Sequence, residues 1–252
     1  MKEVILDVQD LKKSYGGKVA VDGVSFQVKT GEIFGILGPN GAGKTTTLEM
    51  IETLRSIDSG SVTIDGIDVA EDPYAVKHII GVQPQTAAFM DKVTLVEHLE
   101  QLASVYGRHV RARQLLAEVG LVDKAKSYVE TLSGGQRQRF SIVASLVHRP
   151  KVFFMDEPTT GLDPQARHKL WDLVRETRDR GTTVVLTTHY MEEAEVLCDR
   201  VAIMDCGRII ALDTPRGLVK QLLKSGFKKK QHVEQANLED VFINLTGKDL
   251  KE

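Results

Sequence analysis

Eight consecutive residues have the types and spacing needed to hold a polyphosphate. The segment Gly38–Thr45 reads Gly-Pro-Asn-Gly-Ala-Gly-Lys-Thr and fits the phosphate-loop pattern G-x-x-x-x-G-K-[ST]. Its glycines let main-chain N–H groups approach phosphate oxygens at the start of a helix, where the helix dipole favours anions. Lys44 is expected to reach the β- and γ-phosphates, and the Thr45 hydroxyl to bind Mg²⁺. The predicted nucleoside triphosphate site consists of Gly38, Pro39, Asn40, Gly41, Ala42, Gly43, Lys44, Thr45 and Thr46.

Two acidic residues, Asp156 and Glu157, end an apolar stretch that starts at Val152. A carboxylate at the end of a strand beside a phosphate loop lies where Mg²⁺ needs a further ligand, and we assign this role to Asp156. Glu157 is next in sequence and points in a different direction, so it is the candidate general base that polarises the attacking water. Acidic residues often simply end strands, but a phosphate loop in the same chain favours the catalytic interpretation.

Two further polar residues follow predicted strands. His189 comes after the strand Thr182–Thr188, on the catalytic side of a parallel sheet. There it can contact the γ-phosphate or hold Glu157 and the water in line. Gln85 lies where a short apolar strand gives way to helical sequence, and a glutamine there can bind Mg²⁺ or water. Gln83 is an equal candidate by spacing alone.

A second glycine-led segment begins a predicted helix at Leu132-Ser133-Gly134-Gly135-Gln136. Ser133 and Gln136 fit a capping box, which explains part of the motif. Two glycines in the first turn weaken a helix, but they are expected where bare amides must meet an anion closely. If the surrounding helices project away from the phosphate loop, that anion is the γ-phosphate on a partner subunit. Ser133, Gly134, Gly135 and Gln136 are therefore predicted to bind nucleotide.

The elements that must position these residues follow from hydrophobic periodicity. Apolar residues alternate at 4–8 and 24–28, which predicts antiparallel strands with one buried face. We therefore predict an α/β fold with the parallel-sheet core of a phosphate-loop NTPase, an N-terminal antiparallel β subdomain and a helical subdomain inserted at about residues 86–148. Further strands are predicted at 32–37, 61–66, 79–82, 151–155 and 182–187, and helices at 46–51, 94–106, 112–119, 164–180 and 190–198, with a hairpin near 206–207.

Composition limits the classes of partner. The 252 residues suit one large domain with a small subdomain, placed at 1–224, followed by a linker and a short helix at 225–252. The net charge of −2 gives no basic bias, so nucleic acid is not an expected partner. Two cysteines and no signal peptide predict reduced cytosolic thiols. No apolar run reaches the ~18 residues of a membrane span, so any spanning part must belong to another chain.

Together these residues resemble the nucleotide-binding subunit of ATP-binding cassette (ABC) transporters, over about residues 3–220. The resemblance makes the segment from Leu132 to Gln136 the family signature and His189 the switch histidine. It identifies Tyr15, which by its position alone would more often be a packing residue, as the aromatic residue that stacks on adenine. Because family members place their glutamine after a proline, it favours Gln85 over Gln83.

One more segment, Gly161-Leu162-Asp163, resembles the loop that crosses between subunits, and Asp163 joins the expected nucleotide site on that ground. Gly161 stands where many relatives have alanine. Segments 188–195 and 238–242 are similar to drug-resistance-type (ABC-2) exporters, which favours export over import.

The resemblance implies an ATPase that uses ATP and Mg²⁺ and powers a separate integral-membrane permease. Two cassettes, identical or paralogous, would close head to tail around two nucleotides at the cytoplasmic face of the cell membrane. The alternative is a soluble regulatory ATPase of the same type without a transport role. A guanine-nucleotide switch would need an Asn-Lys-x-Asp reader, and a DNA-repair relative a long coiled coil or metal-binding cysteines; neither feature is found in the sequence.

Overall fold

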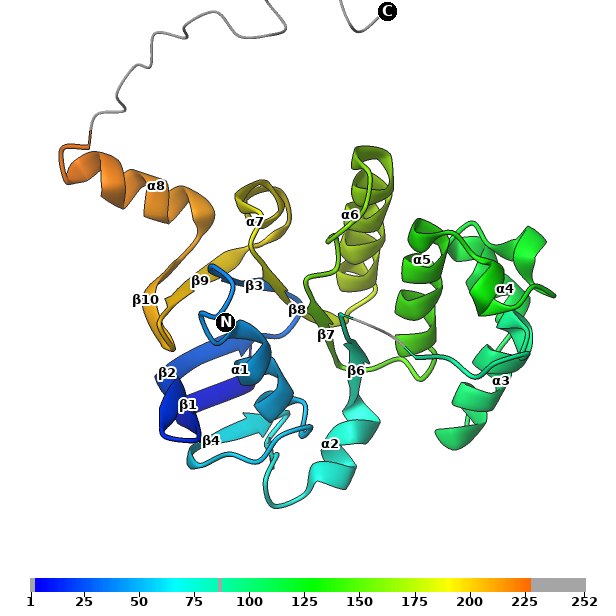
Figure 1. Cartoon of the computed structure of the whole chain (residues 1–252), viewed down its shortest axis with the longest axis horizontal. Coiled ribbons are helices and arrows are strands. Elements are labelled where there is room, and N and C mark those ends of the chain that lie inside the picture. Colours follow the sequence, from blue (N-terminus) through cyan, green and yellow to red (C-terminus); the bar gives the residue numbers. More distant parts are fainter. Residues whose placement is uncertain (1–2, 86–87, 228–252) are drawn as a thin grey trace, which may run out of the picture. The chain divides into compact units, whose positions relative to one another are not determined.

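The computed structural model describes residues 3–85 and 88–227 (Figure 1). The chain divides into two compact units, Met1–Leu218 and Val219–Glu252. Three features predicted from the sequence lie wholly or partly outside the described residues: the linker and short helix at 225–252, the exporter-like segment at 238–242, and the start of the helical insertion at 86–87.

An antiparallel sheet at the N-terminus has the strand order β2-β1-β4-β5. Strands β1 (Val4–Tyr15) and β2 (Lys18–Lys29) form a long hairpin that turns at Gly16-Gly17, which leaves Tyr15 at the tip. Strands β4 (Ser59–Ile64) and β5 (Ile67–Asp68) complete this sheet. The predicted N-terminal subdomain is confirmed, with strands longer than the alternating apolar stretches that indicated them.

The second sheet is mostly parallel, with the order β10-β9-β3-β8-β7-β6, and only the pair β9–β10 is antiparallel. Its three central strands are buried along their whole length, as expected when helices or another sheet cover both faces. The carboxyl ends of these three strands meet at one edge, where ligands bind in open α/β sheets. The strands are β3 (Ile33–Leu37), β6 (Ile80–Gln83), β7 (Val152–Asp156), β8 (Thr183–Thr188), β9 (Arg200–Asp205) and β10 (Arg208–Asp213).

The helices occur in the predicted order, with two additions, α2 and α8, that were not predicted. Between β6 and β7 the chain is helical, which confirms the predicted inserted helices within the part of the chain that the structure describes. The helices are α1 (Lys44–Ile51), α2 (Pro73–Ile79), α3 (Leu95–Val105), α4 (Ala112–Glu118), α5 (Gly134–Ser145), α6 (Pro164–Asp179), α7 (Met191–Leu197) and α8 (Pro215–Lys224), with 3-10 turns at Val122–Lys124 and Val129–Thr131.

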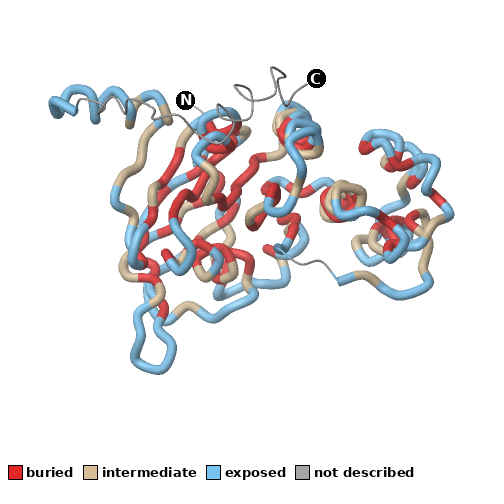
Figure 2. The backbone as a smooth tube through the Cα atoms, turned by 45° about the horizontal axis from the view of Figure 1, so that its top comes forward, coloured by how far each residue is buried: buried red, intermediate tan, exposed pale blue. Residues whose placement is uncertain are grey.

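Two hydrophobic clusters lie on opposite faces of the parallel sheet, and alternate residues of each central strand point into one or the other. In β3, Ile33 and Leu37 join the cluster with α3–α7, whereas Phe34 and Ile36 join the cluster with α1 and the antiparallel sheet. Figure 2 shows the buried residues concentrated along these strands. Rigid packing on both faces therefore fixes the ends of β3, β7 and β8. No helix among the described residues is both long enough and apolar enough to cross a bilayer.

Candidate functional site

The loop between β3 and α1 has the backbone shape that its glycines allow. Gly43, immediately before α1, has φ +101°, and a Cβ there would lie 2.5 Å from the carbonyl oxygen of Ala20. Both the positive φ and the close approach require glycine. The first-turn amides of α1, which begins at Lys44, have no partners within the helix and are available to an anion.

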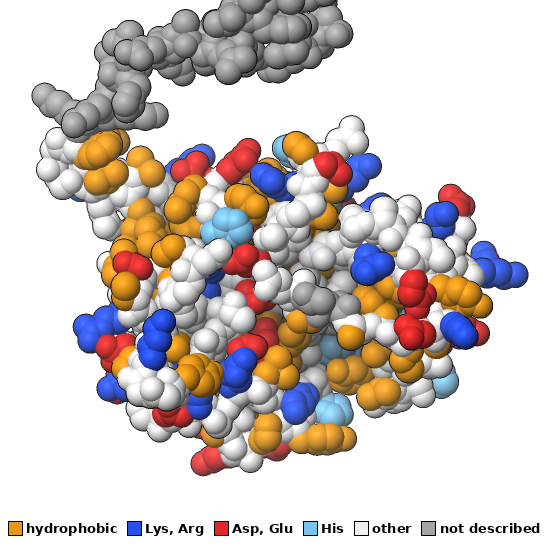
Figure 3. Space-filling view, viewed as in Figure 1, with side chains coloured by type: hydrophobic (Ala, Val, Ile, Leu, Met, Phe, Trp, Pro, Cys, Tyr) orange, Lys and Arg blue, Asp and Glu red, His pale blue; other side chains and the backbone are white. Residues whose placement is uncertain are grey.

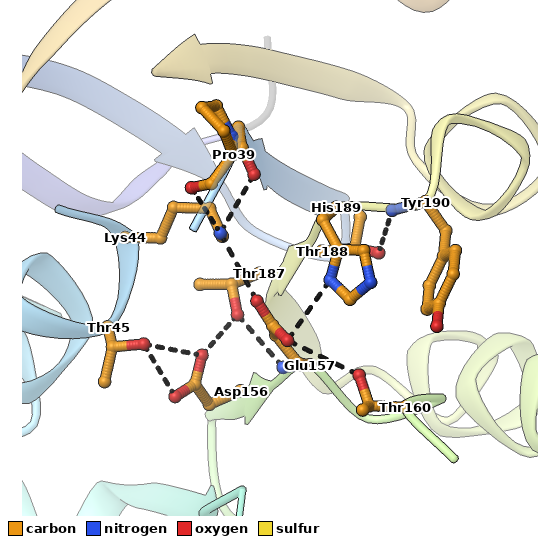
Figure 4. Close-up of polar contacts among 11 residues, drawn as sticks. Pro39, Lys44, Thr45, Asp156, Glu157, Thr160, Thr187, Thr188, His189 and Tyr190 are labelled. Atoms are coloured by element: carbon orange, nitrogen blue, oxygen red, sulfur yellow. Dashed lines mark hydrogen bonds and ion pairs between the residues drawn. The ribbon is translucent and has the colours of Figure 1, made fainter. Parts of the chain in front are cut away.

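Lys44 is the cation of this loop, and its side chain is only 4% exposed. Its amino group donates hydrogen bonds to the carbonyl oxygens of Gly38 (2.9 Å) and Pro39 (3.1 Å). The same nitrogen lies 3.3 Å from Oε1 of Glu157 (Figure 4). The loop thus holds a buried positive charge against the acid that follows β7.

Asp156 and Thr45 face each other across the site. The Thr45 hydroxyl donates to Oδ2 of Asp156 at 3.0 Å, and the Thr187 hydroxyl donates to Oδ1. The described residues contain no cluster of three or more His, Cys, Asp or Glu side chains that could hold a metal by themselves. One carboxylate and one hydroxyl fit Mg²⁺, which usually takes its other ligands from phosphates and water.

Glu157 has an uncommon backbone conformation, with φ +47° for a residue that is not glycine. Its amide donates to Thr187, both to the hydroxyl (3.0 Å) and to the carbonyl oxygen (3.2 Å). This turn aims the side chain between the Lys44 amine and the ring of His189, whose Nδ1 lies 3.2 Å from Oε2. The predicted catalytic acid, histidine and lysine are therefore adjacent.

His189 directly follows β8 and is half-buried. Its ring contacts the ring of Tyr190, with centroids 4.0 Å apart, and the Arg167 guanidinium lies over Tyr190 at 4.9 Å. Although Nδ1 is at ion-pair distance from Glu157, it lacks the angle of a hydrogen bond to any group among the described residues. The ring thus lies tilted against Tyr190, with Nδ1 directed at the acid.

A pocket of about 510 Å³ contains the phosphate loop and brings distant residues together. Both Tyr15 and Gln85 line it, beside Glu157 and Lys44. Gln83, by contrast, is buried, lies outside this pocket, and donates from its amide to the carbonyl oxygen of Pro84 at 2.8 Å. The structure therefore separates two glutamines that spacing alone could not.

Tyr15 is 42% exposed, and two cations lie over its ring, the Lys13 amine and the Arg55 guanidinium, each 5.6 Å from the centroid. The sequence reading missed both of these cations. It also missed Thr187, although Thr187 immediately precedes Thr188 and His189 at the strand end, which is a position that could have identified it.

The glycine-led segment begins α5 as predicted. Ser133 and Gln136 form a complete capping box. A Cβ added to Gly134 would meet nothing within 4 Å, and one at Gly135 would make only ordinary contact, 3.5 Å, with Cβ of Ala166. Nothing within the described chain explains these glycines, and none of the four residues lines the phosphate-loop pocket.

Asp163 lies at the N-cap of α6, where its carboxylate accepts a hydrogen bond from the Ala166 amide at 2.9 Å. Gly161, two residues earlier, has φ +76° and open space around it. The positive φ of this turn therefore accounts for the glycine, and close packing does not. Asp163 is exposed and is absent from the lining of the pocket that Lys44 and Glu157 share.

Comparison with known proteins identifies the family of this site. The family model described as ABC transporter matches residues 21–160. The chain is 43% identical over 223 residues to the linearmycin resistance ATP-binding protein LnrL of Bacillus subtilis, covering 86% of this chain and 72% of the relative. It is 42% identical to the daunorubicin/doxorubicin resistance ATP-binding protein DrrA of Streptomyces peucetius, covering 93% and 72%. It is 35% identical to the Nod factor export ATP-binding protein I of Burkholderia orbicola, covering 98% of each.

Solved structures of ATP-binding cassettes are also similar to this chain. The structure of an ATP-binding subunit of an ABC transporter superposes with a TM-score of 0.79 and 31% identity, covering 96% of this chain and 99% of that one. The ATP-binding cassette MJ0796, solved as a dimer in a post-hydrolysis state with ADP and Pi, superposes with a TM-score of 0.76 and 27% identity, covering 84% and 99%.

Proposed function

The chain belongs to the ABC transporter family as an ATP-binding subunit with ATPase activity, and on this premise we propose that it drives export through a separate membrane-spanning permease. Hydrolysis of MgATP would occur between two cassettes closed head to tail. The export direction is supported by relatives whose names refer to drug resistance and Nod factor export. The subunit would then be located at the cytoplasmic face of the cell membrane.

The observation that carries the proposal is the position of Glu157. Its carboxylate lies between Lys44 at 3.3 Å and His189 at 3.2 Å, with the phosphate loop beside it. A general base must lie within reach of the water that attacks the γ-phosphate, and this acid is held at the mouth of the loop that would carry that phosphate. Its strained backbone is consistent with a position kept for function.

The proposed roles of the other residues follow from their contacts. The Lys44 amine would exchange the carbonyl oxygens of its own loop for phosphate oxygens, which are stronger acceptors. Mg²⁺ would be held by Thr45 and Asp156, with Gln85 as the candidate third side chain, and when bound it neutralises developing phosphate charge. His189 would keep the Glu157 carboxylate in line with the water.

The second half of the nucleotide site is proposed to come from a second cassette. Ser133, Gly134 and Gly135 form a bare helix start without an intrachain packing reason, as expected for amides that meet a γ-phosphate across an interface. Asp163, exposed at the start of α6, would lie at the same interface. Whether the second cassette is an identical chain or a paralogue, the closing contacts would be lost on hydrolysis, and the cassettes would separate.

The proposal is tested by affinity purification of the chain from gently solubilised membranes of its native cell, followed by mass spectrometry. We expect a polytopic membrane protein in stoichiometric amount. Recovery of only soluble partners would overturn the transport role and favour a regulatory ATPase, because the ATPase chemistry does not require a membrane.

A further inference from the structure

Two adjoining cavities lie on the helical insertion, and neither shares a lining residue with the nucleotide pocket. The first, about 490 Å³, is bounded by the turn between α3 and α4, by α4 and by the residues that follow α5; we call it the arginine cavity. The second, about 310 Å³, lies between α4, α5 and α6, and we call it the apolar cavity. Figure 3 shows Lys and Arg side chains on the surface around α4, next to hydrophobic ones. The two cavities share the lining residues Leu115, Glu118, Leu146 and Arg149.

The arginine cavity carries positive charge that the fold does not neutralise. Its lining includes three arginines whose guanidinium groups have no hydrogen bond or ion pair with any residue in the described ranges: Arg108, Arg111 and Arg149. Glu118 is the one acidic residue of this lining, and its carboxylate is already paired with the Arg180 guanidinium. In a chain of net charge −2, three unpaired guanidinium groups around one cavity favour an anionic ligand.

Arg149 is held at the cavity by an uncommon backbone conformation. Its φ is +57°, a value that residues other than glycine seldom adopt. The Arg149 amide donates to the carbonyl oxygen of Leu146 at 2.9 Å, and the next residue, Pro150, is buried. The turn after α5 is therefore fixed, while the Arg149 side chain stays exposed and unpaired. Strain of this kind is consistent with a position that is kept for a ligand.

The apolar cavity offers few free polar groups. The hydroxyls of Thr177 and Thr182 donate to backbone carbonyl oxygens at 2.8 and 3.1 Å, and Arg180 is paired with Glu118. A hydrocarbon chain fits such a lining better than a group that needs hydrogen bonds. The aliphatic side chains of the lining are Leu115, Val119, Val143, Leu146 and Leu173.

Together the two cavities are complementary to a ligand with an anionic head and an aliphatic chain. A guanidinium group binds phosphate oxygens in pairs, and a phosphate monoester carries about −1.5 to −2 charges at pH 7, so it matches several arginines at once. The aliphatic chain would remove the surface of the apolar cavity from water. A neutral head would leave the arginines unused, and a free phosphate ion would leave the apolar cavity unfilled.

We propose that the arginine cavity and the apolar cavity form one binding site for a phosphate-bearing amphiphile, with its phosphate on Arg108, Arg111 and Arg149 and its aliphatic chain between α4 and α6. This site goes beyond the proposed transport function and does not depend on it. Two sources supply the required chemistry, a phospholipid of a membrane and a soluble alkyl phosphate. Because α5 starts at Gly134, after the Ser133 cap, and its later residues line the apolar cavity, the ligand would contact the helix that the glycine-led segment begins.

The first experiment is isothermal titration calorimetry of the full chain saturated with MgADP, so that the phosphate loop is occupied. The probes are decyl phosphate below its micelle-forming concentration, ethyl phosphate, which lacks the chain, and decyl maltoside, which lacks the charge. We expect saturable one-to-one binding of decyl phosphate, and affinities at least about tenfold lower for the other two. Equal affinities for the three probes, or no binding of decyl phosphate, would overturn the proposal.

A pair of charge reversals two residues apart locates the site. Arg111→Glu should lower the affinity for decyl phosphate at least about tenfold, because it replaces a charge-assisted hydrogen bond by repulsion. Arg113→Glu is the matched control, because Arg113 is also exposed and unpaired within the described chain but lines neither cavity. Its affinity should stay within about twofold of wild type. Both variants should keep wild-type MgADP affinity, which shows that they fold, and wild-type decyl phosphate affinity in folded Arg111→Glu would overturn the site.

Co-sedimentation with vesicles distinguishes the two sources. The vesicles contain phosphatidylcholine with or without phosphatidic acid, whose head is a phosphate monoester, and the chain is again saturated with MgADP. Recruitment by phosphatidic acid that falls at least about fivefold in Arg111→Glu, but not in Arg113→Glu, would identify a membrane lipid as the ligand. Binding of decyl phosphate without recruitment would identify a soluble amphiphile. Recruitment without binding of decyl phosphate would reflect surface charge alone and would overturn the cavity site.

Discussion

Replacing Glu52 by Gln should stabilise the free cassette in a pH-dependent way. Burial, followed by repulsion from Asp156 and Glu49, raises the pKa of Glu52 from 4.5 to about 8. Below pH 4.5 the group is protonated in both the folded and the unfolded chain, so it has no effect there. As the pH rises from 4.5 to 8 the unfolded chain loses this proton while the folded chain keeps it, and stability falls.

The size of the effect follows from the same shift. Each pH unit over which only the unfolded chain ionises costs about 1.4 kcal/mol, so the wild-type penalty is about 3 kcal/mol at pH 7 and about 5 kcal/mol above pH 8. Gln resembles the protonated acid and escapes this penalty. For a chain of this size, about 3 kcal/mol corresponds to a rise in Tm of about 6–12 °C.

The assay is thermal unfolding of wild type and Glu52→Gln from pH 4.5 to 8.5, without nucleotide and with EDTA. The difference in Tm should grow with pH and level off above pH 8. Glu49→Gln removes a carboxylate from the same helix at a site bonded to Arg55, and it should show only a small part of the trend, because repulsion by Glu49 is the smallest of the three causes that raise the pKa of Glu52. A difference that stays constant across the pH range would refute the reasoning, because a purely steric effect of the substitution would not depend on pH.

Two further substitutions test the nucleotide site. Tyr15→Ala should weaken ATP binding about tenfold, because the exposed ring would no longer stack on the base, whereas Tyr15→Phe should bind like wild type. Isothermal titration calorimetry measures the three affinities, and equal values for wild type and both variants would exclude the stacking role. Ser133→Arg should leave ATP affinity within about twofold of wild type but lower ATP turnover at least about tenfold, because Ser133 is exposed and lies outside the phosphate-loop pocket. Loss of ATP binding in this variant would argue against a role of Ser133 in the partner's site.

Much of the fold follows from local sequence signals. The apolar stretches at 33–37 and 152–155 give buried strands, and the capping boxes at Thr94 and Ser133 give the starts of α3 and α5. Helix α2 lacks such a strong signal, because it is short and has a single buried residue, Val76. Helix α8 has no buried residue, but Leu218, Val219, Leu222 and Leu223 recur at helical spacing, so this helix was predictable from the sequence and was overlooked.

The parts of the candidate site that are built from consecutive residues were predictable from the sequence. The phosphate loop and the pair Asp156-Glu157 are contiguous, and the structure brings them together. The contacts of Thr187 with both acids depend on the register between β7 and β8, which a single strand does not encode. Glu52 was missed for a similar reason: only the tertiary structure shows that this acid at the end of a helix is buried.

The most direct test of the account is the oligomeric state of Glu157→Gln with MgATP, measured by size-exclusion chromatography with light scattering. Removing the base should stop hydrolysis while leaving ATP binding intact, so we expect a stable dimer with MgATP, a monomer with MgADP, and a monomer with MgATP when Ser133→Arg is added. ATP turnover by Glu157→Gln at the wild-type rate, or a variant that binds MgATP and remains monomeric, would contradict hydrolysis by Glu157 within a closed pair of cassettes.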